Sequence, residues 1–166
     1  MNSDAFILSA LEYPDGRLDV VLDTDTYNEI DDQFALAYLI KSPERVNLQA
    51  VYAAPFFNAN SVSPADGMEK SYMEIEKVLA LCKRSDLWKS SYRGADRYFP
   101  DEKTPVCSDA AKDLVERAKS RPEGKPLYVV AIAALTNIAS ALLLAPEISR
   151  KIVVVWLGGH AYDWPD

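Results

Sequence analysis

Apolar and polar positions alternate along the chain between strand-like runs and helix-like repeats. Short apolar runs of strand length occur four times, and polar turns and segments with helical spacing separate them. In the clearest helix, apolar side chains recur at alternating steps of four and three over residues 68–82 and line one face. The predicted strands are 18–23, 46–54, 127–133 and 152–157. The predicted helices are 31–42, 68–82, a helix capped by Ser108 and ended by Pro122, and a short helix that follows the turn 134–137 and ends at about Leu144.

This order of elements predicts an α/β fold. Strands that alternate with helices favour an open, mostly parallel sheet with helices on both faces, because each parallel crossover needs a helix. A chain of 166 residues is about the size of one domain and buries roughly two-thirds of its unfolded surface. No repeat or linker interrupts the pattern, so we expect residues 1–166 to form a single α/β domain. The polar stretch 85–105 shows little regular pattern.

Composition and charge restrict the possible partners. The net charge of −7 and the sequence pI near 4.8 argue against a surface for nucleic acid or anionic membranes, which require clustered Lys and Arg. No run of 18 apolar residues predicts a membrane span. Cys82 and Cys107 lie in no metal-binding spacing, and the N-terminus lacks the pattern of a signal peptide. The expected compartment is the cytoplasm.

The most informative motif is an acidic turn that follows the first predicted strand. Asp23 and Asp25 lie at the end of the strand, and Asp31 and Asp32 lie at the start of the next helix. Carboxylates crowded this closely repel one another, so they require a cation or a shared proton. The carboxyl ends of the strands are also where open α/β sheets bind their ligands. We therefore expect the chemistry of this protein at the acidic turn.

Polar turns also follow the other three predicted strands. They contain Asn58 after the second strand, Thr136 and Asn137 after the third, and Gly-Gly-His at 158–160 after the fourth. In a parallel sheet, these turns and the acidic turn lie at the same edge, so they converge on one crevice. Each turn also has a structural interpretation, because Asp, Thr and Asn are common helix caps and paired glycines permit tight turns.

The only histidine and several aromatic residues are further candidates. His160 fits either a general acid near neutral pH or an ordinary loop histidine. Aromatic side chains near the strand ends fit either stacking on a planar ring or packing against the fold. They are Tyr27, Phe56, Phe57, Tyr162 and Trp164.

Several of these motifs together resemble the inosine-uridine preferring nucleoside hydrolase family. The order and approximate spacing of the motifs agree with that family, and the resemblance covers most of the chain from Val20 onward. It implies a Rossmann-like α/β core and hydrolysis of the N-glycosidic bond of ribonucleosides to ribose and free base. The motifs are Asp23-Thr24-Asp25, Asp31-Asp32, Leu135-Thr136-Asn137-Ile138-Ala139 and Val155-Trp156-Leu157-Gly158-Gly159.

The resemblance implies a calcium site that activates water. Asp25 resembles a Ca²⁺ ligand that is also the catalytic base, Asp32 a second ligand, and Thr136 a ligand through its main-chain carbonyl. Hydrolysis of a glycosidic bond requires an activated water and stabilisation of an oxocarbenium-like sugar. Ca²⁺ lowers the pKa of bound water less than Zn²⁺ does, so a carboxylate such as Asp25 is still needed to take the proton.

The resemblance also implies contacts with substrate and with other copies of the chain. Asp31 and Asn58 resemble residues that contact the ribose hydroxyls, and Asp23 resembles a carboxylate that supports the base. The implied substrate is a small nucleoside in purine or pyrimidine salvage, and the implied assembly is a homodimer or homotetramer.

The chain departs from the family pattern in two ways. Residues 26–30 separate Asp25 from Asp31, whereas the common family turn has three residues there, so the turn is expected to bulge. Asn28 and Glu29 are expected either to add ligands or to reshape the ribose pocket. Family members are also nearly twice as long. We therefore expect residues 1–166 to be the N-terminal part of a longer nucleoside hydrolase fold.

Two alternative functions remain open at this point. A haloacid-dehalogenase-like phosphatase would use Asp23 as nucleophile and Asp25 as acid together with Mg²⁺. The position of Tyr27, where that pattern has Thr or Val, does not match it. The other alternative is a catalytically incomplete fragment that binds metal or ribose.

Overall fold

A parallel β-sheet forms the centre of the molecule. The computed structural model describes residues 4–159, and its five strands are arranged in the order β3-β2-β1-β4-β5. Every pair of neighbouring strands is parallel, which confirms the predicted α/β class. The strands are β1 (Leu18–Thr24), β2 (Val46–Ala53), β3 (Ser91–Arg93), β4 (Leu127–Ala131) and β5 (Ile152–Trp156).

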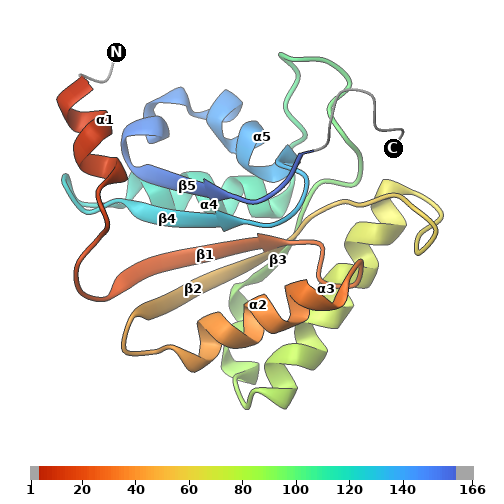
Figure 1. Cartoon of the computed structure of the whole chain (residues 1–166). Helices are drawn as coiled ribbons and strands as arrows, with labels where there is room; N and C mark the ends of the chain where they lie inside the picture. Colours follow the sequence, from red (N-terminus) through yellow and green to blue (C-terminus); the bar gives the residue numbers. More distant parts are fainter. Residues whose placement is uncertain (1–3, 160–166) are drawn as a thin grey trace.

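Helices cover both faces of the sheet. Figure 1 shows α2 and α3 on one face and α4 and α5 on the other, as predicted for crossovers between parallel strands. No helix within residues 4–159 is long and apolar enough to cross a membrane. The helices are α1 (Asp4–Leu11), α2 (Ile30–Lys41), α3 (Pro64–Leu81), α4 (Asp109–Lys119) and α5 (Thr136–Leu144), with 3₁₀ turns η1 (Ser85–Ser90) and η2 (Pro146–Arg150).

The two helical layers produce two apolar cores because successive strand side chains point to opposite faces. Val21 and Val129 are fully buried against α4 and α5. Leu22 and Val51 are buried on the opposite face, where Leu36 of α2 and Leu79 of α3 cover them. With apolar residues on both faces, β1 is held firmly in the middle of the sheet, and this fixes the position of the acidic turn that follows it.

The helix starts follow from capping residues. Ser63 accepts a hydrogen bond of 3.1 Å from the backbone of Asp66, and Pro64 occupies the first turn of α3. The predicted cap of α4 is confirmed, because Ser108 Oγ accepts a hydrogen bond of 3.1 Å from the backbone N–H of Ala111.

Two parts of the fold were not expected. The stretch 85–105, whose sequence pattern is irregular, contains η1 and β3. The pattern does not reveal β3 because this strand has only three residues and is stabilised by pairing with β2. Tyr92 of β3 also packs edge-on against Tyr52 of β2, with ring centroids 6.0 Å apart. The second unexpected element is α1, which precedes the first predicted strand.

The order of the strands creates a switch point beside β1. The chain proceeds from β1 to β2 and β3 on one side and then places β4 on the other side of β1. Loops therefore leave β1 and β4 toward opposite faces of the sheet. In open α/β folds, the crevice at the carboxyl ends of such strands is the usual ligand site. The acidic turn and residues 135–137 both lie at this crevice.

Candidate active site

The acidic turn is a hydrogen-bonded turn between β1 and α2. The backbone N–H of Asn28 donates a hydrogen bond of 2.6 Å to the carbonyl oxygen of Asp25. The side chain of Asn28 also donates to Asp25 Oδ2 at 3.0 Å. Residues 25–28 therefore form a closed turn, and α2 begins two residues later at Ile30.

Asp32 connects the first turn of α2 to the end of β1. Its Oδ2 accepts a hydrogen bond of 2.6 Å from the Thr24 hydroxyl and one of 3.1 Å from the backbone N–H of Asp25. The hydroxyls of Thr24 and Thr26 lie 2.9 Å apart. Because Thr24 gives its only hydroxyl proton to Asp32, Thr26 is the donor in this contact. The buried hydroxyls thus form a short relay that orients Asp32.

Asp23 lies deeper in the crevice and is bound by Asn137. Its Oδ2 accepts a hydrogen bond of 2.9 Å from Asn137 Nδ2, and both side chains are fully buried. Its other oxygen, Oδ1, is the one buried side-chain N or O atom without a hydrogen-bond partner in the described part of the chain. A buried acceptor in this condition is costly unless a donor or a cation satisfies it.

Asn137 also connects three other segments to this site. Its Nδ2 donates to the carbonyl of Ala53 at 3.2 Å, and its Oδ1 accepts from the backbone of Ala95 at 2.8 Å and from the Ser108 hydroxyl at 3.1 Å. Gly94 lies so close that a Cβ there would overlap the carbonyl of Ala53 and the Asn137 amide. Asn137 therefore joins the carboxyl ends of β1 and β2 to the loop before α4.

Burial shifts the acid–base properties of the three carboxyl groups. It raises the pKa of Asp23 to about 7, against the opposing effect of the Asn137 hydrogen bond. Burial likewise raises the pKa of Asp32 to about 7, and the nearby charge of Asp25 adds to the shift. The pKa of Asp25 is raised by its burial and by the charge of Asp23. The hydrogen-bond donors of the crevice therefore do not fully stabilise the ionised forms of these carboxyl groups.

The other predicted site residues lie around this group. Thr136 is buried as the first residue of α5 and directly precedes Asn137. Asp31 is exposed in the first turn of α2. Asn58 is exposed, and its amide donates to Asn28 Oδ1 at 2.6 Å. The contacts of Asp31 and Asn58 with ribose stay predictions, and His160, Tyr162 and Trp164 lie outside the described residues.

Asn28 and Asn137 are two site residues whose contacts the sequence alone did not indicate. In the sequence, Asn28 is only one residue of the lengthened turn, and Asn137 is indistinguishable from an ordinary helix cap. The available signal was their position, because each asparagine lies in a polar turn that follows a predicted strand. An asparagine can donate and accept at once, which suits a position between carboxylates and main-chain groups.

The oxygen-rich crevice fits a hard divalent cation better than a transition metal. No three His, Cys, Asp or Glu side chains within residues 4–159 are grouped to hold a metal ion by themselves. The predicted ligands are two carboxylates and a main-chain carbonyl, which is an all-oxygen set of the kind that Ca²⁺ and Mg²⁺ use. The raised pKa values of Asp25 and Asp32 and the unsatisfied Asp23 Oδ1 indicate that a positive charge would be stabilised here.

A doubly wound sheet with carboxylates at its switch point defines an α/β protein with a ligand site at the carboxyl edge. Comparison with known families is more specific, because the profile of the inosine-uridine preferring nucleoside hydrolases matches residues 20–163. The chain therefore belongs to this family, as the resemblance in the sequence implied.

Known proteins agree with this assignment. The chain is 27% identical to probable uridine nucleosidase 2 of Arabidopsis thaliana in an alignment of 161 positions, which covers 86% of this chain and 48% of the relative. It thus spans about half the length of that relative.

Solved structures share the fold. A purine-preferring ribonucleoside hydrolase from Gardnerella vaginalis matches with a TM-score of 0.66 and 21% identity over 86% of this chain and 49% of that one. The type III effector XopQ in complex with adenosine diphosphate ribose matches with a TM-score of 0.64 and 19% identity over 93% and 48%. An inosine-uridine preferring nucleoside hydrolase from Bacillus anthracis matches with a TM-score of 0.55 and 20% identity over 86% of this chain and 51% of that one.

Proposed function

We propose that this chain carries the metal and catalytic-base half of a calcium-dependent nucleoside hydrolase. The observation that carries the proposal is the grouping of the buried Asp23 and Asp32 with the half-buried Asp25 at the switch point, with Asp23 Oδ1 left without a hydrogen bond. Family membership supplies the reaction class, which is hydrolysis of the N-glycosidic bond of a ribonucleoside.

Asp25, Asp32 and the main-chain carbonyl of Thr136 would hold the calcium ion. When bound, Ca²⁺ would supply positive charge that polarises the attacking water. Asp25 is only half-buried, so it can face both the ion and the solvent side of the crevice, whereas Asp32 is 5% exposed and fixed by Thr24. These environments suit a base and a purely structural ligand, respectively.

In the proposed reaction, Asp25 takes a proton from water as the water oxygen bonds to the anomeric carbon. The bond between that carbon and the nucleobase nitrogen breaks, and the nucleobase leaves with the bonding electron pair and takes a proton from solvent. The carboxylates stabilise the positive charge that develops on the sugar. Asp31 and Asn58 are proposed to contact the ribose hydroxyls, and Asp23 is proposed to support Asp25, the catalytic base.

The burial of Asp23 argues against the phosphatase alternative. A nucleophilic aspartate must reach the phosphorus atom, but Asp23 has no exposed surface and its Oδ2 is bound to Asn137. The same contacts suit a supporting carboxylate. The proposed substrate is therefore a nucleoside. The assembly into a homodimer or homotetramer and the cytoplasmic location stay predictions.

Ribose release by wild type and Asp25→Asn, measured with a reducing-sugar assay on purine and pyrimidine nucleosides, tests the function. The asparagine keeps the size of the side chain but cannot accept the proton, so turnover should fall at least about 10²-fold. Undiminished ribose release in this variant would disprove the role of Asp25. Calorimetry with Ca²⁺ and ribose in the same buffers distinguishes an active hydrolase from a catalytically incomplete fragment. Such a fragment would bind Ca²⁺ and ribose without releasing the nucleobase.

A further inference from the structure

We propose that Asn28 is a positioning residue that holds the carboxylate of Asp25 in the orientation needed by the calcium site. The inference deepens the proposed function, in which Asp25 is the base and a metal ligand. Asn28 makes two hydrogen bonds to Asp25, from its backbone N–H to the carbonyl at 2.6 Å and from its side-chain Nδ2 to Oδ2 at 3.0 Å. It therefore fixes both the main chain and the side chain of Asp25.

A second asparagine determines which end of the Asn28 amide faces Asp25. Asn58 Nδ2 donates to Asn28 Oδ1 at 2.6 Å, so the carbonyl end of that amide is directed away from Asp25 and the donor end toward it. An ionised carboxylate can only accept hydrogen bonds. The contact from Asn58 therefore orients the Asn28 amide so that its NH₂ group, and not its carbonyl oxygen, faces the Asp25 carboxylate.

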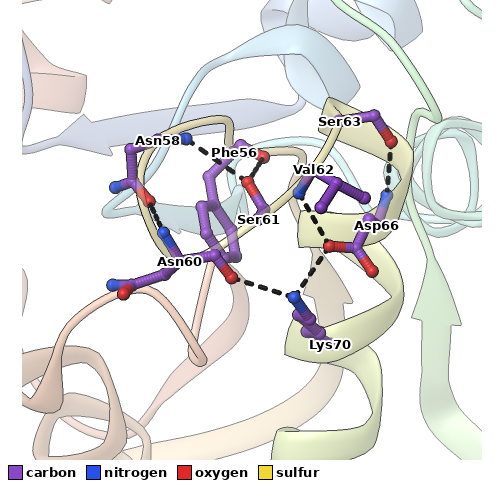
Figure 2. Close-up of polar contacts among 8 residues, drawn as sticks. All are labelled: Phe56, Asn58, Asn60, Ser61, Val62, Ser63, Asp66 and Lys70. Atoms are coloured by element: carbon purple, nitrogen blue, oxygen red, sulfur yellow. Dashed lines mark hydrogen bonds and ion pairs between the residues drawn. The ribbon is translucent and has the colours of Figure 1, made fainter.

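The loop that carries Asn58 is itself rigidly bonded, as Figure 2 shows. Asn58 Oδ1 accepts a hydrogen bond of 2.9 Å from the backbone of Asn60, and the backbone N–H of Asn58 donates to Ser61 Oγ at 3.3 Å. Ser61 is buried and donates to the carbonyl of Phe56 at 3.1 Å. Lys70 of α3 holds the carbonyl of Asn60 at 2.9 Å.

Asn60 provides a second connection between this loop and the acidic turn. Its Nδ2 donates to the backbone carbonyl of Asn28 at 3.0 Å. The two carbonyl oxygens of Asn28 thus accept hydrogen bonds from Asn58 and Asn60 of one loop, and its backbone N–H and side-chain Nδ2 both donate to Asp25. The chain of contacts runs from α3 through the loop after β2 to the carboxylate at the end of β1.

This arrangement accounts for the two residues by which the acidic turn exceeds the common family turn. The longer turn places Asn28 where it can reach both Asp25 and Asn58, which lie after different strands of the sheet. Groups that orient a metal ligand are worth 10–100-fold in metal affinity or activity in other proteins, so a substantial effect is expected here.

Calcium titration of the full chain by calorimetry tests the inference. Asn28→Ala should weaken Ca²⁺ binding by about 10–100-fold. Asn58→Ala should weaken it less, and the double variant should bind no more weakly than Asn28→Ala alone, because Asn58 acts through Asn28. The matched control is Asn47→Ala, which removes an asparagine–aspartate contact of 2.6 Å to Asp19 at the opposite end of β1 and should leave Ca²⁺ affinity unchanged. Equal Ca²⁺ affinity in wild type and Asn28→Ala would overturn the inference.

Calcium-free crystal structures of wild type and Asn28→Ala give a readout that does not depend on metal. We expect one Asp25 rotamer in wild type and several in the variant, and the same single rotamer in both would overturn the positioning role. If wild type binds no Ca²⁺, the calcium part of the proposed function fails, and the Asp25 rotamers still decide the role of Asn28.

Discussion

Asn137 donates a hydrogen bond of 2.9 Å to Asp23, joining two buried side chains that are 114 residues apart in the sequence. The contact connects the carboxyl end of β1 to the segment that follows β4. These two strands are neighbours at the switch point. At this position, the same contact therefore lines the candidate site and holds the sheet together.

Replacing Asn137 should be among the most destabilising single changes in the chain. Asn137→Leu removes four hydrogen bonds at once and leaves Asp23, the Ala95 N–H and the Ser108 hydroxyl without this partner. Buried polar groups left unsatisfied cost about 1–3 kcal/mol each, so we expect a loss of about 3–5 kcal/mol in the free energy of unfolding. Urea denaturation measures it. The control Glu116→Ala changes an exposed helix residue and should stay within about 0.5 kcal/mol of wild type. A similarly small loss for Asn137→Leu would show that Asn137 does not hold these segments together.

Gly94 should be intolerant of any side chain for a steric reason. A Cβ at this position overlaps the carbonyl of Ala53 and the amide of Asn137, which are both held in the crevice. We expect Gly94→Ala to cost about 3 kcal/mol or more, since backbone and a bonded amide must move. Gly16→Ala is the matched comparison, because Gly16 has open space around it and a φ of 76°, so only backbone strain of about 1–2 kcal/mol applies. Equal losses in thermal or urea unfolding would refute the steric explanation.

Most of the fold could be predicted because each central element carries its own local signal. The strands 18–23 and 152–157 are apolar runs, and the helix 68–82 has one continuous apolar face, so these signals survive without knowledge of neighbours. The element β3 could not be predicted, because three residues are too few for a periodic pattern and its stability comes from β2 and the Tyr52 ring.

The site was predictable as a location more than as a set of contacts. The strand-then-turn pattern correctly brought the acidic turn and residues 135–137 to one edge of the sheet. The partner of Asp23 and the role of Asn28 depend on side-chain geometry between segments far apart in the sequence. No local pattern encodes such pairings, so an N-cap and a bridging asparagine look the same in one sequence.

Calcium should stabilise the chain through Asp32 and not through its neighbour Asp31. At a calcium concentration 100 times the Kd, binding adds about 2.7 kcal/mol to the unfolding free energy, which is about 5–10 °C in Tm for a domain of this size. Asp32→Asn should lose this shift, because Asp32 is a buried predicted ligand. The exposed Asp31→Asn should keep it. Thermal unfolding with Ca²⁺ and with a chelator measures the difference, and an equal shift in Asp32→Asn would remove Asp32 from the ligand set.

Alkaline pH should weaken the fold through Tyr52. Burial raises the pKa of Tyr52 well above 10. Asp113, which accepts a hydrogen bond of 2.7 Å from the Tyr52 hydroxyl, adds to the shift, while Arg117 opposes it. A group whose pKa is higher in the folded state contributes its full stabilisation below its unfolded pKa near 10 and loses it as the pH rises toward the folded value.

The comparison of wild type with Tyr52→Phe isolates this effect. At neutral pH, the variant should be less stable by about 1–2 kcal/mol, because it lacks the hydrogen bond to Asp113. Above about pH 10, the wild type should lose up to about 1.4 kcal/mol per pH unit more than the variant, so the gap between them should close. Urea unfolding from about pH 8 to 11 measures the gap, with Tyr13→Phe as the control because Tyr13 is 86% exposed. A gap that stays constant across this range would show that Tyr52 does not keep its proton in the folded protein.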